Sequence, residues 1–305
     1  MDSANKKLYL KSFLAGGVAS MCAKTSVAPL DRMKILLQGQ NKYYKDLGVF
    51  SGLKTIVKKE GFSGLYKGNN AQMVRIFPYG AVQFVSFEMY RMILRKSFGQ
   101  SHFHNFLAGS TAGITAVAIT YPLDVVRACL AFQIKGEHVY SGIFDAFSRI
   151  IKKEGGMMNL YKGFSPAVIA VIPKIGLSFY SFEKIKYLCL EYAPDVCGQY
   201  NSYGEQNLTV FAKLLCGGFA GAVAQIISYP LDTARRKMQL SNLSPHHYRK
   251  GLFTTIFLTY YQDGIARGLY RGMTINFLKI PMVAVSFTVY ELLKEHFNVN
   301  KILHS

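Results

Sequence analysis

The sequence predicts an all-α membrane protein with six transmembrane helices, organised as three repeats that each place one short surface helix between two spanning helices. Three observations predict this fold class. The 305-residue chain contains several apolar stretches of about twenty residues or more, the length needed to cross a hydrocarbon core of ~30 Å. Lys, Arg, Gly or Pro interrupts nearly every stretch, as expected for helices that face a watery interior on one side. A proline-containing motif occurs three times, about 100 residues apart.

Three motifs recur in the same order in every repeat. The first is a proline followed by an acid and, three residues after the acid, a base. The second is an acid and a glycine followed by an aromatic residue, a base and a glycine, and the third is an aromatic residue and an acid followed by a base. The motifs begin at Pro29, Glu60 and Phe87, at Pro122, Glu154 and Phe182, and at Pro230, Asp263 and Tyr290. Nine matches in fixed order leave little room for chance, and they divide one membrane domain into repeats 1–100, 101–206 and 207–305.

Each repeat is expected to contain two long helices. The first helices cover residues 8–37, 103–132 and 209–239, and the second cover 71–96, 165–190 and 274–296. Small residues such as Gly109, Gly113, Gly217 and Gly221 in the first helices would let backbones approach closely in a membrane. The segments between the two helices are polar and amphipathic, which fits helices lying on the membrane surface.

Composition narrows the class of protein. The formal net charge is +19, but the basic residues are spread over all three repeats and no nucleic-acid-binding motif is present, so an anionic membrane or solute explains the charge better. Five cysteines lack a metal-binding or CxxC spacing, and their odd number fits reduced thiols. The sequence predicts neither an enzyme nor a metal site.

The three motifs together resemble the mitochondrial carrier family over the whole chain. Segments such as Leu65-Tyr66-Lys67-Gly68-Asn69 and Arg75-Ile76-Phe77-Pro78-Tyr79-Gly80 are similar to the coenzyme A carriers of that family. The resemblance implies a threefold pseudosymmetric, multi-pass transporter of the mitochondrial inner membrane, with both termini on the cytosolic side and the surface helices on the matrix side.

The first motif predicts a gate on the matrix side. Each acid could pair with the base three residues later in its own helix, whereas the resemblance implies a ring in which each acid pairs with the base of the next repeat. Repetition around one axis favours the ring. The expected pairs are Asp31 with Arg127, Asp124 with Arg235, and Asp232 with Lys34. Gln38 and Gln239 occupy the positions where the family braces these pairs, while the second repeat has Ala131 there.

The third motif predicts a corresponding cytosolic gate. Its residues are Glu88, Arg91, Glu183, Lys186, Tyr290, Glu291 and Lys294. Only Tyr290 supplies a hydroxyl to brace a pair, because Phe87 and Phe182 have none. We therefore expect the cytosolic gate to be the weaker one, so that the resting carrier is accessible from the cytosol.

A substrate without threefold symmetry should be bound by residues that break the symmetry. Lys24, Arg75, Lys174 and Lys279 are cations without basic counterparts at the same register, and no unrepeated acid lies in the helix centres to neutralise them. They predict a site for phosphate or carboxylate groups, in which Arg75 could bind two oxygens at once. Lys279 stands one position off the register of Arg75. Tyr79, Gln83 and Ser178 are further candidates for contacts with the substrate, while Ala170 and Val171 replace the glycine and aliphatic residue that form an adenine pocket in many nucleotide carriers.

Bound lipid is expected at the starts of helices, where free amides and the helix dipole attract phosphate. The resemblance implies structural cardiolipin there and no other cofactor. The glycines at these positions are Gly52, Gly68, Gly142, Gly163, Gly251 and Gly272.

The sequence thus predicts a monomeric carrier of a small phosphorylated anion, with coenzyme A or a related adenine nucleotide as its candidate substrate. Alternating access between the two gates, in an antiport cycle, is the expected mechanism. The alternative is a protein with the same fold that acts as a proton leak or membrane scaffold and moves no solute. An ADP/ATP exchanger fits less well, because residues 235–239 lack the run of methionines typical of it.

Overall fold

The computed structural model describes residues 3–98, 102–153, 156–200, 206–243 and 251–279. The long helices follow the predicted ones to within a few residues. They are α1 (Ser3–Gln38), α3 (Asn69–Phe98), α4 (His102–Phe132), α6 (Phe164–Tyr192) and α8 (Val210–Gln239). A sixth helix, α10 (Met273–Leu278), begins at the predicted place, and the remainder of the predicted helix 274–296 lies outside the described residues. Each long helix has at least 29 residues and, at ~1.5 Å per residue, exceeds the thickness of a hydrocarbon core.

The long helices differ in how apolar they are. In the described part of the chain, the segments apolar enough to span a membrane are His104–Phe132, Met157–Tyr192 and Phe211–Gln239. α1 and α3 have the required length but are less apolar along their length.

Short helices occupy the three connecting segments. They are α2 (Val49–Glu60), α5 (Ile143–Lys153) and α9 (Leu252–Gly264), each followed by one further helical turn at Phe62–Tyr66, Met157–Tyr161 and Ile265–Leu269. α5 shows the amphipathic pattern clearly, because it buries Ala146 and Ile150 and exposes Phe144. One feature was not predicted: α7 (Pro194–Cys197) and a two-stranded antiparallel pair, β1 (Gly198–Tyr200) and β2 (Gln206–Leu208), lie between α6 and α8.

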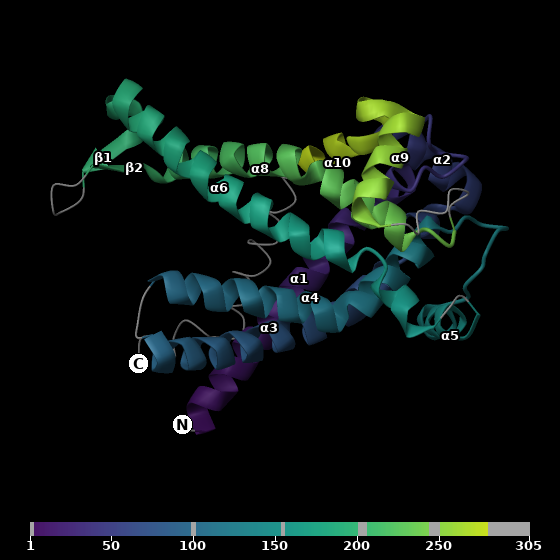
Figure 1. The fold of residues 1–305 in the computed structure, drawn as a ribbon, viewed down its shortest axis with the longest axis horizontal. Helices are drawn as coiled ribbons and strands as arrows, with labels where there is room; N and C mark the ends of the chain where they lie inside the picture. Colours follow the sequence, from purple (N-terminus) through teal and green to yellow (C-terminus); the bar gives the residue numbers. More distant parts are fainter. Residues whose placement is uncertain (1–2, 99–101, 154–155, 201–205, 244–250, 280–305) are drawn as a thin grey trace. The chain divides into compact units, whose positions relative to one another are not determined.

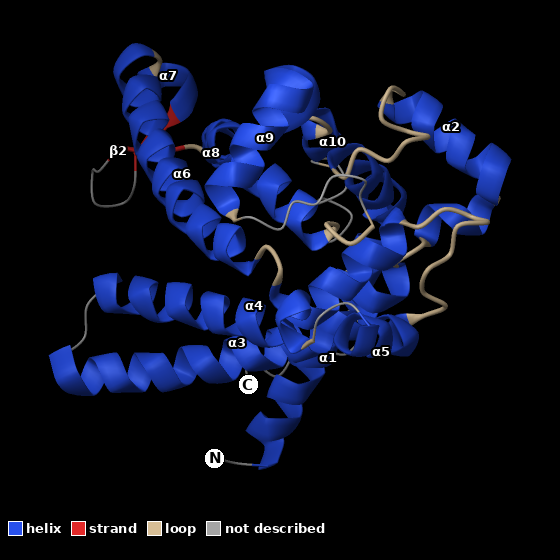
Figure 2. Cartoon of the chain, turned by 45° about the vertical axis from the view of Figure 1, so that its right-hand side comes forward, coloured by secondary structure: helices blue, strands red, loops and turns tan. Residues whose placement is uncertain are grey.

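The chain divides into two compact units. The first comprises residues 1–164, 236–247 and 274–305, and the second comprises 165–235 and 248–273. In the first unit α3 and α4 lie side by side along their length and α1 packs against both (Figures 1 and 2). Its core gathers at the ends of α1 and α4, around Met33, Leu36, Ile56, Phe132 and Leu240.

The buried small residues are alanines adjacent to the predicted glycines. Ala108, Ala112 and Ala116 are fully buried along one face of α4, whereas an added Cβ at Gly113 would meet no atom of the described residues within 4 Å. In the second unit, α8 likewise buries Ala212, Ala220 and Ala224 and not Gly217 or Gly221. Within the described residues of each unit, small residues therefore pack at a spacing of four, and the fully buried positions of α4 include the alanines next to Gly109 and Gly113.

Candidate substrate site and gates

Asp31 on α1 lies between two cations from distant parts of the first unit. Arg127 Nη2 on α4 is 2.6 Å from Asp31 Oδ2, and Lys279 Nζ, just after α10, contacts Asp31 Oδ1. The structure therefore brings the acid of repeat 1 to the base of repeat 2, the arrangement predicted for a ring. Lys279, which was assigned to the substrate site, shares the same carboxylate.

Asp124, one turn before Arg127 on α4, has a similar set of partners. Its Oδ1 is 2.9 Å from Arg75 Nη1 on α3, and its Oδ2 accepts a hydrogen bond of 3.0 Å from Gln239 Nε2. The guanidinium of Arg75 also donates through Nε to Thr120 Oγ1 at 3.3 Å. Arg75 is thus neutralised by a repeated gate acid, a partner that was overlooked because only unrepeated acids were considered.

The remaining candidate substrate residues of the first unit are Tyr79, Lys24 and Gln83. The guanidinium carbon of Arg75 lies 5.4 Å from the ring centre of Tyr79. Lys24 is exposed and interacts electrostatically with Asp31 and Lys279. Gln83 is exposed on α3.

The second unit holds other predicted residues. Lys174 is exposed and Ser178 half-buried on α6. Asp232 accepts a hydrogen bond of 2.9 Å from Gln225 Nε2, seven residues earlier on α8. Gln225 is the counterpart of Lys24, so this bond shows that residues seven apart, as Lys24 and Asp31 are, share one helix face. The matrix-gate residue Arg235 is half-buried on α8. In the first unit, Lys34 is half-buried and Gln38 is buried on α1.

The described cytosolic acids are paired within their own helices. Glu88 is 3.7 Å from Arg91 on α3, and Glu183 is 3.9 Å from Lys186 on α6. Tyr290, Glu291 and Lys294 lie outside the described residues. These local contacts differ from the contact of Asp31 with Arg127, which joins two repeats.

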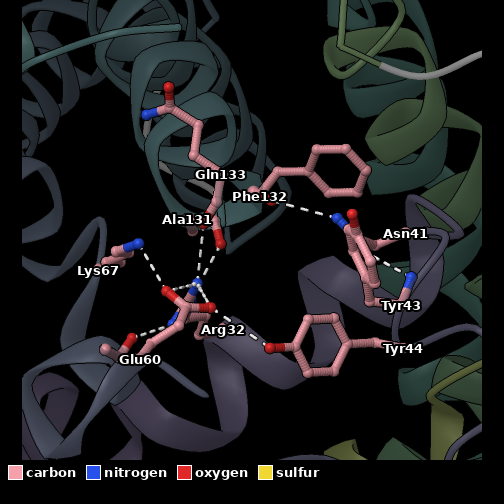
Figure 3. Close-up of polar contacts among 10 residues, drawn as sticks. Arg32, Asn41, Tyr43, Tyr44, Glu60, Lys67, Ala131, Phe132 and Gln133 are labelled. Atoms are coloured by element: carbon pink, nitrogen blue, oxygen red, sulfur yellow. Dashed lines mark hydrogen bonds and ion pairs between the residues drawn. The ribbon is translucent and has the colours of Figure 1, made fainter. Parts of the chain in front are cut away.

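Arg32, next to Asp31, was not predicted as a functional residue, and its guanidinium contacts three other segments of the first unit (Figure 3). It is 1% exposed, and its Nη2 is 2.9 Å from Glu60 Oε1 at the end of α2. Its Nε donates to the carbonyl of Ala131 at 3.1 Å, and Nη2 donates to the carbonyl of Gln133 at 2.8 Å. A cation at these carbonyls stabilises the C-terminus of α4, so Arg32 joins α1, the α2 segment and α4. Its counterparts Val125 and Thr233 are uncharged, an asymmetry that could have identified it.

Glu60 is held as a carboxylate by its partners. Burial alone would raise the pKa of Glu60, but the hydrogen bond from Lys67 and the charge and hydrogen bonds of Arg32 outweigh burial and lower it. Tyr44 Oη also donates to Glu60 Oε1 at 3.3 Å. Burial, with the nearby carboxylate, raises the pKa of Tyr44 to about 12.

Two tyrosines that precede the motif prolines form the same contact in two repeats. Tyr121 Oη donates to the carbonyl of Lys162 at 3.2 Å, and its ring stacks on Tyr161 at 6.1 Å. Tyr229 Oη donates to the carbonyl of Arg271 at 2.7 Å, and its ring stacks on Tyr270 at 5.9 Å. Each pair ties the first helix of a repeat to the turn that begins its second helix. The sequence showed a signal for this contact, because both proline motifs begin with tyrosine.

The glycines assigned to lipid sites fall into two groups. Gly68, Gly163 and Gly272 have φ near +80° directly before α3, α6 and α10, and a Cβ on Gly68 would lie 2.9 Å from the carbonyl oxygen of Arg127. Before the surface helices, Gly142 precedes α5, Gly251 precedes α9 with φ 103°, and Gly52 lies inside α2 against Met33.

Comparison with known proteins identifies the family. The family model described as "Mitochondrial carrier protein" matches residues 5–98, 99–193 and 206–301, one match for each repeat. The chain belongs to the mitochondrial carrier family. As a member of it, the protein is a multi-pass transporter of the mitochondrial inner membrane and not an enzyme.

Several named relatives are similar to this chain over most of its length. "Solute carrier family 25 member 16" of Mus musculus is 52% identical over 298 residues, covering 96% of this chain and 90% of the relative. "Mitochondrial coenzyme A transporter SLC25A42" of Rattus norvegicus is 40% identical over 95% of this chain and 89% of its own length. "Mitochondrial carrier protein CoAc2" of Zea mays is 39% identical over 94% of this chain and 86% of its own length. The predicted resemblance to this family and to its coenzyme A carriers is therefore confirmed.

Proposed function

We propose that this carrier transports a phosphorylated anion by alternating access, with coenzyme A or a related adenine nucleotide as the first candidate substrate and exchange as the mode. One observation carries the proposal: the unrepeated cations Arg75 and Lys279 bind the carboxylates of the gate acids Asp124 and Asp31. A substrate that binds these cations therefore acts directly on gate residues.

The exposure of these cations allows an anion to compete for them. The side chains of Arg75 and Lys279 retain 16% and 19% of their accessible surface, whereas the side chain of Asp124 retains only 3%. A phosphate presents more acceptor oxygens than a carboxylate, and charge-assisted hydrogen bonds contribute ~1.5–3 kcal/mol each. When Arg75 and Lys279 turn to a phosphate, Asp31 keeps Arg127 and Asp124 keeps Gln239.

This exchange of partners couples substrate binding to opening of the matrix gate. Reversing a conformational ratio from 1:99 to 99:1 takes ~5.5 kcal/mol of differential binding. Two or more charge-assisted contacts supply that amount only if they are stronger in one conformation than in the other. The relatives named for coenzyme A transport support coenzyme A as the phosphorylated anion to test first.

Uptake measurements test the transported solute. The purified protein is reconstituted in liposomes, and uptake of labelled coenzyme A, ADP and ATP is measured with and without the unlabelled compounds inside. We expect uptake of at least one of them, stimulated by internal anion. If no anion is taken up but the protein conducts protons, the proton-leak alternative replaces the proposal. If the protein shows neither uptake nor proton conductance, the scaffold alternative is favoured.

Arg75→Gln tests the site. This change keeps a hydrogen-bond donor for Asp124 but removes the charge, so we expect uptake to fall by roughly 10- to 100-fold. Coenzyme A should also no longer raise the melting temperature of the variant. Arg95→Gln changes the same residue type at an exposed position near the end of α3 and should transport normally. Full uptake by Arg75→Gln would remove Arg75 from the site.

We also propose that the carrier works as a monomer and binds structural cardiolipin at its helix starts. The helix starts that follow the positive-φ glycines before α3, α6 and α10 support this proposal, because the free amides and the dipole at a helix start attract phosphate. Added cardiolipin should raise the melting temperature of the detergent-purified protein more than phosphatidylglycerol does. Light scattering combined with size exclusion should give the mass of one chain.

A further inference from the structure

Three of the five cysteines gather where α6 ends and α8 begins, within the second unit. Cys189 Sγ on α6 lies 3.7 Å from Cys216 Sγ on α8, and Cys197 at the end of α7 is within hydrogen-bond reach of Cys189. Cys216 is 2% exposed, while Cys189 and Cys197 are half-buried. The thiols belong to a small apolar cluster with Leu208 and Ala212.

The distance between Cys189 and Cys216 is a van der Waals contact and not a bond. A disulfide needs an S–S distance of ~2.05 Å, so the two sulfur atoms must approach by less than 2 Å. Rotation of a cysteine side chain between staggered rotamers moves its sulfur by more than that distance. In the reduced state these thiols are apolar packing groups.

Their position places them beside the cytosolic gate. Cys189 is three residues, about one helical turn, beyond Lys186, which pairs with Glu183. α6 belongs to the second repeat and α8 to the third, so a bond between them joins neighbouring repeats. Alternating access requires the repeats to move apart and together at this end.

We propose that Cys189 and Cys216 are a modification site at which a low-molecular-weight disulfide of the glutathione type forms a reversible bond between α6 and α8. The bond holds these two helices together and slows transport. This last step, the regulation of the carrier, rests on the alternating-access function proposed above. The formation of the bond does not.

The bond between Cys189 and Cys216 forms in two thiol–disulfide exchange steps. The thiolate of Cys189 attacks one sulfur of the small disulfide, whose S–S bond breaks, and the first small thiolate leaves and takes up a proton. Cys216 then loses its proton and attacks the Cys189 sulfur, and the second small thiolate leaves with that proton. Two protein thiols are oxidised and one small disulfide is reduced to two thiols. A small dithiol reverses both steps.

Peptide mapping tests which bond forms. The full-length carrier in liposomes is treated with oxidised glutathione, alkylated and digested with trypsin, which places Cys189 and Cys197 in peptide 187–213 and Cys216 in peptide 214–235. We expect these two peptides to be joined, and to remain joined in the Cys197→Ala variant. A bond between Cys189 and Cys197, which stays within one peptide, or the absence of any bond, would overturn the proposal.

Transport measurements test the consequence. We expect oxidation to slow uptake by about tenfold, as for a blocked conformational step, and reduction by dithiothreitol to restore it. Cys216→Ala should transport normally and be insensitive to oxidised glutathione, while Cys129→Ala, buried in the first unit, should respond like the wild type. A carrier that is fully linked yet transports at the full rate would contradict the regulatory role.

A carrier that moves no anion when reduced would contradict the proposed function. Formation of the Cys189–Cys216 bond would still be tested by the joined peptides and by a higher melting temperature after oxidation. The two proposals therefore fail on different measurements.

Discussion

Arg32 shows how a single residue can connect segments that are distant in the sequence. Its guanidinium contacts the carboxylate of Glu60 and main-chain carbonyls of Gly64, Ala131 and Gln133. A charge buried to this degree is stable only with a complete set of partners. Removing one partner therefore costs more than the contact itself contributes.

Replacing Arg32 by Met should be strongly destabilising. The methionine fills part of the space but leaves Glu60 buried with only Lys67 and Tyr44, so we expect a loss of ~3–5 kcal/mol. Thermal unfolding of the detergent-purified protein measures this loss. The double variant Arg32→Met with Glu60→Gln should recover part of it, because the stranded charge is gone. A loss below ~1 kcal/mol, typical of surface pairs, would show that the contact is unimportant.

The depressed pKa of Glu60 predicts a response to acid. A carboxyl whose folded-state pKa lies below its unfolded value adds stability above the unfolded value, and this stability is lost as the pH falls through the folded value. The groups that face Glu60 are Arg32, Lys67 and Tyr44. We therefore expect the melting temperature to fall as the pH drops below about 4.5, the ordinary value for glutamate.

The matched control is Glu60→Gln, which has no proton to gain at this position. Its melting temperature should start lower than that of the wild type and fall less steeply over the same pH range. Parallel curves for the two proteins would mean that other carboxyl groups account for the acid response.

Repeats 2 and 3 form the same contact between their first helix and the turn before their second helix. Tyr121 and Tyr229 each donate a hydrogen bond to that turn and stack on its tyrosine. Repeat 1 has Ala28 at this position and uses Arg32 to reach the carbonyl of Gly64 in its own connecting segment. Two solutions to the same packing problem therefore coexist in one chain.

Tyr121→Phe should keep the stacking and lose only the hydroxyl. The hydroxyl donates to the carbonyl of Lys162 and accepts from Gln239, so we expect a loss of ~1–3 kcal/mol from the groups left without a partner. Tyr192→Phe, at an exposed position that ends α6, is the matched control and should be neutral. Equal melting temperatures for both variants would contradict the role assigned to the Tyr121 hydroxyl.

Helix positions were predictable because apolar length and proline, glycine and charge patterns determine where helices begin and end. Repetition favoured a ring of ion pairs over local pairs, and the family resemblance implied which acid meets which base, as in the contact of Asp31 with Arg127. The partner of Arg75 was not predictable in this way. Asp124 binds it across two helices, a contact that depends on tertiary packing. The one-position difference between Gly109 and Ala108 has the same origin, since adjacent residues share spacing but not the packed face.

Within the described residues, the acids of the matrix-gate and cytosolic-gate motifs differ in the partners they contact. At the matrix-gate motif, Asp31 contacts a base from another repeat, whereas at the cytosolic motif Glu88 and Glu183 contact only bases of their own helices among the contacts described. Local i,i+3 pairs on exposed helix faces contribute only ~0.3–0.5 kcal/mol. They hold no two repeats together.

The resting carrier should therefore be open to the cytosol. Gln83 is exposed on α3, two turns beyond Arg75 toward the cytosolic pair Glu88–Arg91, so a cysteine at this position in a background without other cysteines should react with a membrane-impermeant maleimide added from the cytosolic side. Ser63→Cys, exposed in the connecting segment of the first repeat, is expected on the matrix side and should react only after permeabilisation. Because substrate binding drives the conformational change, an exchangeable anion should slow the reaction at position 83. Near-complete protection of position 83 without substrate would show that the weak local pairs do not leave the cytosolic side open.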